Sequence, residues 1–159
     1  MAVQARSREL QGKFNFTVHD LSSGFTTAKF QQCTGAEITF AIAEYSEGGA
    51  AAPMKEATRA SFSNVTLQHG ITSSNLDFWT WCKQIVDMLA NLPEGTGVAS
   101  PNQLRNFTIR KRKRDRTVYR QLKLFNCQPA RFNPGDQDNT SDDIDIEELE
   151  LAYEYFAIA

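Results

Sequence analysis

The 159-residue sequence has few of the side chains that catalysis and metal binding require. It has two histidines, His19 and His69, and neither has a partner at the spacing of metal ligands. No HExxH, GxGxxG, GxxxxGK or GxSxG pattern occurs, and the EF-hand spacing of acidic residues is absent. Both histidines are therefore predicted to be surface residues. We expect no enzymatic activity, no metal and no cofactor.

Cysteine is scarce as well. Cys33, Cys82 and Cys127 are an odd, widely spaced set without a CxxC pair, which predicts neither a zinc site nor a disulfide framework. They are interpreted as small buried hydrophobic residues. A disulfide between subunits of an extracellular particle remains the alternative.

Long apolar runs are also missing, since none reaches the roughly 20 residues that a membrane-spanning helix needs. Residues 1–10 lack the apolar core of a signal peptide, so we expect the protein to be made and folded in the cytoplasm. The hydrophobic fraction of 41% and charged fraction of 23% are typical of a globular protein. The length predicts one domain, residues 1–159.

Alternating apolar and polar residues predict most of the secondary structure. Strands are expected over residues 13–19, 36–45, 64–68, 106–109, 118–125 and 144–156, with another extended stretch from Phe25. The last stretch changes phase, which predicts a bulge near Glu147 and Glu148. Six or seven strands and one helix make a mainly β, α+β fold.

Residues 36–45 form the longest early strand, in which Ile38, Phe40 and Ile42 share one parity and are expected to face the core. The return strand is expected to carry Val65 and Leu67. Between them, residues 46–59 include Gly48, Gly49 and Pro53, and the connection exceeds the usual hairpin loop of about 2 to 5 residues. Either this loop is loose, or it becomes ordered against another copy of the protein.

A helix is predicted over residues 74–92, with Ser74 as its cap, and Pro93 and Gly95 follow it. Its apolar face is expected to contain Phe78, Cys82, Ile85 and Leu89. Trp79 and Trp81 lie about 200° apart around a helix, so they cannot share one narrow stripe. Either the helix is sandwiched, or one indole packs on a neighbouring subunit.

The net charge of -2 hides a strong asymmetry. Residues 110–116 read RKRKRDR, whereas residues 136–154 carry many of the acids. Three interpretations remain open for this basic stretch: a hydrated turn, a rim that meets an acidic rim on the next subunit, or a transient contact with DNA. No aromatic residue interleaves with the basic residues, which weighs against base stacking as a main function. The rim residues are Arg110, Arg112, Arg114 and Arg116.

Several collinear motifs resemble those of the phage tail tube protein family, which includes the inner tubes of extracellular contractile injection systems. They are CTGA at 33–36, AEYSEGG at 43–49, SNVTLQHG at 63–70, DFWTWCKQI at 77–85, NFTIRKRKRD at 106–115, LFNCQPARF at 124–132 and IEELELAYEYF at 146–156. No single motif is specific, but together they cover nearly the whole chain after about residue 12.

The resemblance implies a curled β-sandwich or split barrel with one flanking helix, whose hexameric ring closes a continuous β-barrel around a channel. It implies that residues 1–12 form an N-terminal arm and that residues 46–59 contact the adjacent ring. The ring-stacking residues would be Tyr45, Glu47, Gly48, Gly49, Pro53, Met54, Lys55 and Arg59. The channel would be lined by Glu37, Thr39, Ala41, Asn64, Thr66, Gln68, Thr108 and Gln121.

The implied function is that of a structural subunit of an inner tail tube through which a contractile phage tail delivers DNA. The expected partners are sheath, baseplate and tail terminator, and the expected location is the virion tail, assembled in the host cytoplasm. An injection-system tube that carries a protein effector is the alternative, and a monomeric nucleic-acid-binding β-barrel is a third hypothesis. Sheet edges provide independent support for assembly, because open edges promote uncontrolled pairing unless identical subunits close them into a barrel.

Overall fold

The computed structural model describes residues 15–20, 30–70, 76–91, 103–136, 138–140 and 142–159. These residues form nine strands and one helix, which confirms the expected mainly β fold with a single helix. The elements are β1 (Phe16–Asp20), β2 (Gln32–Thr34), β3 (Ile38–Tyr45), β4 (Met54–Phe62), β5 (Val65–Gly70), α1 (Asp77–Ala90), β6 (Arg105–Arg112), β7 (Val118–Asn133), β8 (Ile146–Ala152) and β9 (Tyr155–Ile158). In the described part of the chain, no helix is long and apolar enough to cross a membrane.

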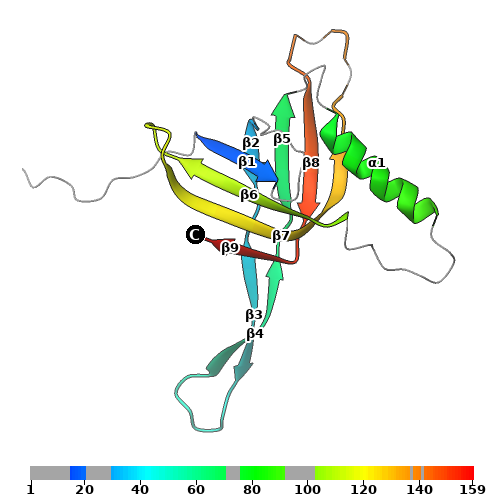
Figure 1. The fold of residues 1–159 in the computed structure, drawn as a ribbon. Helices are drawn as coiled ribbons and strands as arrows, with labels where there is room; N and C mark the ends of the chain where they lie inside the picture. The colour runs from blue at the N-terminus through cyan, green and yellow to red at the C-terminus, as the bar shows by residue number, and fades with distance from the viewer. Residues whose placement is uncertain (1–14, 21–29, 71–75, 92–102, 137, 141) are drawn as a thin grey trace, which may run out of the picture.

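Seven strands form one antiparallel sheet in the order β1-β6-β7-β8-β5-β2, with β9 also paired to β7. The sheet is curled, and β7 belongs to both halves (Figure 1). The first layer consists of β1, β6, β9 and the N-terminal part of β7. The second layer consists of β2, β5, β8 and the C-terminal part of β7. The remaining strands, β3 and β4, form a separate ribbon that projects from the body (Figure 1).

The change of layer along β7 occurs around Asn126, whose φ of 53° lies in the left-handed region. Asparagine tolerates this conformation because its short polar side chain can form local hydrogen bonds. Here the backbone N–H of Asn126 donates to Oδ1 of Asn106 at 3.0 Å, and its Nδ2 donates to Oε2 of Glu154 at 2.6 Å. The β6–β7 register also shifts between Arg105 and Phe107. Such irregularities are how a strand turns a corner between two packed layers.

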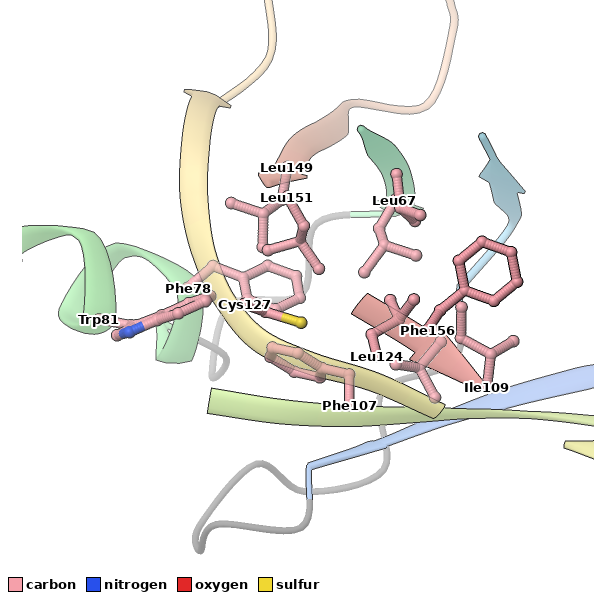
Figure 2. Close-up of a cluster of buried hydrophobic side chains, with 12 residues drawn as sticks. Leu67, Phe78, Trp81, Phe107, Ile109, Leu124, Cys127, Leu149, Leu151 and Phe156 are labelled. Atoms are coloured by element: carbon pink, nitrogen blue, oxygen red, sulfur yellow. The ribbon is translucent and has the colours of Figure 1, made fainter. Parts of the chain in front are cut away.

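The core lies between the two layers and under α1 (Figure 2). Its buried members are Val18, Phe107, Ile109, Leu124, Cys127 and Phe156 from the first layer and its corner, Val65, Leu67, Leu149 and Leu151 from the second, and Phe78 and Trp81 from α1. Along β5 and in the second half of β8, buried residues alternate with partly exposed ones, as expected for strands that have one face in the core. The alternation therefore predicted real core positions at Val65, Leu67, Leu149 and Leu151, whereas Ile144 and Tyr155 in the last stretch are exposed.

The helix is shorter than predicted. It begins after Leu76, which makes no side-chain capping hydrogen bond, while Ser74 lies outside the described residues. Trp81 is buried, and its Nε1 donates to the carbonyl oxygen of Gln103 at 3.0 Å. Leu89, expected on the apolar face, is 58% exposed. The structure thus buries Phe78 and Trp81 and leaves one flank of the helix exposed, including Trp79.

Two strand predictions are wrong. The partner of β3 is β4, whereas Val65 and Leu67 belong to β5, which pairs with β2 and β8. The bulge predicted near Glu147 and Glu148 is absent, since the β5–β8 register runs without a shift from Gly70↔Ile146 to Val65↔Leu151. The irregularity lies instead on β7, opposite β8. The expected N-terminal arm and the stretch of residues 25–29 lie outside the described residues.

The ribbon leaves the body at a backbone kink. Gly35 has φ of 100° and the next residue, Ala36, has φ of 62°. A Cβ on Gly35 would overlap the backbone carbonyl of Asn64, just before β5. The kink therefore needs glycine for two reasons, the left-handed conformation and the close approach of the backbone.

Replacing Gly35 with alanine should lower the free energy of unfolding of the subunit by about 1 to 3 kcal/mol, because it adds a backbone clash to the cost of the positive φ. The matched control is Gly49→Ala. Gly49 also has a positive φ, 92°, but its Cβ would meet no atom within 4 Å, so a smaller loss, at most about 1 kcal/mol, is expected. Urea denaturation followed by circular dichroism measures both, and equal losses would contradict the clash.

Candidate assembly surfaces

The β3–β4 ribbon, hereafter the projecting hairpin (residues 38–62), packs against very little of the described part of the subunit. Every residue of β3 is exposed, as is every residue of β4 except the half-buried Phe62. Large apolar side chains are among them: Phe40 is 55%, Ile42 53%, Tyr45 64% and Met54 70% exposed. The expectation that Ile38, Phe40 and Ile42 face the core of the subunit is therefore wrong. A two-stranded ribbon has no second layer to cover either face, and it is marginally stable alone.

Local contacts define the shape of the projecting hairpin. The Nζ atom of Lys55 lies 2.8 Å from Oε1 of Glu44 across the two strands. The hydroxyl of Thr58 donates to the carbonyl oxygen of Ala41 at 3.1 Å, where the register shifts between Ala41 and Ile42. Both interactions are exposed and contribute little stability on their own.

All eight residues expected to stack rings lie on this hairpin. Tyr45 ends β3, residues 47–53 include the tip, and Met54, Lys55 and Arg59 lie on β4. The expected loop of residues 46–59 is thus shorter in the structure, because β4 begins at Met54. The irregular tip spans residues 46–53.

The outward face of the second layer is polar. Asn64, Thr66 and Gln68, expected in the channel, lie beside or on β5. Nδ2 of Asn64 donates to Oε1 of Glu150 at 2.7 Å, and Nε2 of Gln68 donates to Oε2 of Glu148 at 2.9 Å. These two glutamates were missing from the predicted set, although their alternation with Leu149 and Leu151 could have placed them on this face.

The other expected channel residues lie elsewhere. Thr108 is on β6 in the first layer and only 1% exposed, and Gln121 on β7 lies opposite Arg110 in the same layer. Glu37 precedes the projecting hairpin, while Thr39 and Ala41 are on it. The eight residues are therefore divided among three regions, and a single subunit does not bring them onto one surface.

The basic stretch forms a hairpin between β6 and β7, as expected. Arg110 and Arg112 lie on β6, whereas Arg114 and Arg116 lie in the turn. The N–H of Lys113 donates to the carbonyl oxygen of Thr117 at 2.8 Å, which closes the turn. Nearby, burial and the positive charges of Arg110 and Arg112 lower the pKa of His19.

His69 is not the surface residue that was predicted. It is 5% exposed, and its Nδ1 lies 2.7 Å from Oε1 of Glu147 on the paired strand β8. Phe30 and Phe78 flank the imidazole, with ring centroids 5.8 and 6.1 Å away. Burial raises the pKa of Glu147, and the charge and hydrogen bond of His69 oppose that rise. The pair thus places an imidazole and a carboxylate side by side next to Phe78 of α1.

An open cleft of about 530 Å³ lies where the two layers diverge, between β2 and the inner face of the first layer. Its lining includes Phe16, Ile109 and Phe156 together with Lys111 and Arg120. Among the described residues that line it, there is no carboxylate and no imidazole. In the described residues, no group of three His, Cys, Asp or Glu side chains could hold a metal ion.

A family model described as T4-like virus tail tube protein gp19 matches residues 12–157. The chain belongs to this tail tube family. This match confirms the expected family resemblance. It also confirms that the chain is a structural protein, because tail tube proteins are structural components. No curated protein gave a significant match.

Solved structures with the same fold agree with membership of the tail tube family. One is a chain of an extracellular contractile injection system, the PVC sheath–tube complex in the extended state, with 18% identity, coverage of 96% of this chain and 93% of that chain, and a TM-score of 0.75. Another is the tube-terminating cap of the anti-feeding prophage, with 18% identity, coverage of 100% and 99%, and a TM-score of 0.76. Hcp1 from Flavobacterium johnsoniae is more distant, with 12% identity, coverage of 90% and 93%, and a TM-score of 0.50. At these identities the similarity establishes the fold.

The three cysteines of this tail tube protein are free thiols, Cys127 fully buried and Cys33 and Cys82 partly so. Burial raises the pKa of Cys127 to about 12 and that of Cys33 to about 11, and it also raises the pKa of Cys82. Because the thiolate is the reactive form, these thiols are deactivated at neutral pH.

Treatment of the native subunit with iodoacetamide at about pH 8 should therefore leave Cys127 unmodified, while denaturation first should allow all three cysteines to react. Mass spectrometry of tryptic peptides measures each site. Modification of Cys127 in the native protein as fast as in the denatured protein would contradict its burial.

Proposed function

We propose that the chain is the repeating subunit of an inner tail tube, in which hexameric rings stack through the projecting hairpin. The observation that supports this most strongly is the exposure of Phe40, Ile42, Tyr45 and Met54 on a ribbon that the described body does not cover. Fully burying one large apolar side chain is worth about 1.5 to 3 kcal/mol. By the same estimate, burial of these four side chains against the next ring would supply several kcal/mol per subunit.

The second layer supplies the edges for ring closure. Among the described strands, β2 pairs only with β5, and the C-terminal part of β7 pairs only with β8. The other edge of each strand has no strand partner in the described chain. Joining these two edges between neighbouring copies would continue the sheet around a ring and remove its exposed edges. The two edges differ, so the contact is head-to-tail and can close into a cyclic assembly.

In such a ring the channel would be lined by the outward face of the second layer. That face carries Asn64, Thr66 and Gln68 together with Glu148 and Glu150. The proposed lining omits Thr108, which is buried in the subunit. The lining would be uncharged or acidic apart from Arg131, whose Nη1 lies 3.0 Å from Oε1 of Glu148.

An acidic lining would repel a polyanion and so limit its adhesion during passage. This suits DNA as the cargo of a contractile phage tail, with sheath, baseplate and tail terminator as partners. Fold similarity to an extracellular contractile injection system supports the alternative cargo, a protein effector. Sequencing and mass spectrometry of material retained inside purified assembled particles distinguish DNA from protein.

Electron microscopy of the purified chain tests the assembly. The wild type should form rings and tubes, whereas Phe40→Ser combined with Ile42→Ser should raise the protein concentration needed for tubes at least about tenfold, because it removes apolar contacts between rings. The subunit should remain folded by circular dichroism, since both side chains are exposed within it.

Val86→Ser is the matched control. Val86 is 61% exposed and lies on α1, outside the projecting hairpin, so tube formation should be unchanged. Tubes of wild-type length from the hairpin variant would refute its role in stacking. A wild-type chain that stays monomeric at high concentration would refute the proposed function itself.

A further inference from the structure

The charges of the chain are concentrated in two separate segments. The basic hairpin, residues 110–123, has one acidic residue, Asp115, among eight basic residues: Arg110, Lys111, Arg112, Lys113, Arg114, Arg116, Arg120 and Lys123. The acidic connection, residues 134–145, has no Lys or Arg and contains Asp136, Asp138, Asp142, Asp143 and Asp145. Each segment therefore carries predominantly one sign of charge.

The two segments lie at opposite ends of one long strand. The turn of the basic hairpin precedes β7 at Val118, and the acidic connection follows β7 after Asn133. This strand has 16 residues. At roughly 3.3 Å per residue, even a bent strand of this length separates its ends by tens of ångströms. Figure 1 shows the β6–β7 turn and the β7–β8 connection on different sides of the molecule, so one subunit does not join them.

Local interactions also leave this charge largely uncompensated. None of Arg110, Arg112 and Arg116 forms an ion pair within the described part of the chain. The lowered pKa of His19, which reflects burial and then Arg110 and Arg112, agrees with a positive field on this face. At the other segment, Asp136 and Asp142 are exposed and form no ion pair among the described residues. Surfaces of opposite sign attract and orient partners before close contact.

We propose that the basic hairpin of one subunit docks on the acidic connection of an adjacent copy. This inference rests on the proposed function, and it adds the specific surfaces through which neighbouring copies recognise each other. The two surfaces differ, so the contact is head-to-tail, as in a closed ring. DNA is the competing partner for a basic surface. An adjacent copy is favoured because every chain carries one acidic connection for each basic hairpin, so the two surfaces can pair in equal numbers.

A charge exchange tests the contact. Arg112→Glu with Arg116→Glu, and separately Asp136→Lys with Asp142→Lys, should each raise the concentration for ring formation roughly tenfold at low salt, because attraction is replaced by repulsion. The variant that combines all four changes should return to within about threefold of wild type. Sedimentation velocity measures the assembly. Lys83→Glu, on α1, is the control for charge change and should have little effect.

Wild-type ring formation gives a second test that needs no variant. Raising the salt from about 0.05 to 0.5 M should weaken ring formation, because screening reduces attraction between exposed charges. Rings that ignore salt and form normally in both double variants would overturn the docking contact while leaving the proposed function intact. Unchanged rings together with loss of short-duplex DNA binding in Arg112→Glu, Arg116→Glu would assign the hairpin to DNA instead. A wild type that never forms rings would overturn both proposals.

Discussion

No layer in the described part of the subunit covers the apolar side chains of the projecting hairpin, and the proposed assembly depends on this constraint. A ribbon of two strands buries too little surface to be stable by itself. In the proposed tube, Phe40, Ile42 and Tyr45 would gain their packing energy from the next ring. Membership of the tail tube family explains why such a surface is retained, since a tube subunit works only in contact with its copies.

The body of the subunit positions this hairpin and the sheet edges. The corner at Asn126 folds one strand into two layers, and the buried side chains between the layers hold them together. The kink at Gly35 and Ala36 directs the ribbon away from the second layer. Core packing and backbone geometry thus leave three features exposed in the described subunit: a projecting apolar ribbon, incomplete sheet edges and separated charges.

Much of the secondary structure could be predicted from local patterns, because alternation at Val65, Leu67, Leu149 and Leu151 reflects burial on one side. Pairing could not be predicted as well. The alternation around Phe40 indicates that one face becomes buried, but it does not say whether the covering surface belongs to the same subunit. The strand of Val65 and Leu67 was taken as the partner of β3 because residues 46–59 were interpreted as a loop, whereas β4 begins at Met54.

Other errors arose from long-range contacts. His69 looked like a strand-end surface residue, yet Glu147 lies beside it only because β5 pairs with β8. Thr108 has the polarity of an exposed position and is buried nonetheless. The predicted channel residues could not be recognised as three separate groups before the course of β7 through two layers was known. The location of the basic hairpin, in contrast, followed from a local turn between two recognisable strands.

Hydrogen–deuterium exchange in dilute and assembled protein tests the dependence of the hairpin on its neighbours most directly. In dilute monomer, amides of β3 and β4 should exchange rapidly while those of β5 and β8 are protected by the core. Assembly should slow exchange in β3 and β4 to the range of the core strands. Equal protection of β3, β4, β5 and β8 in the monomer would contradict the account, because the hairpin would then be stable without another subunit.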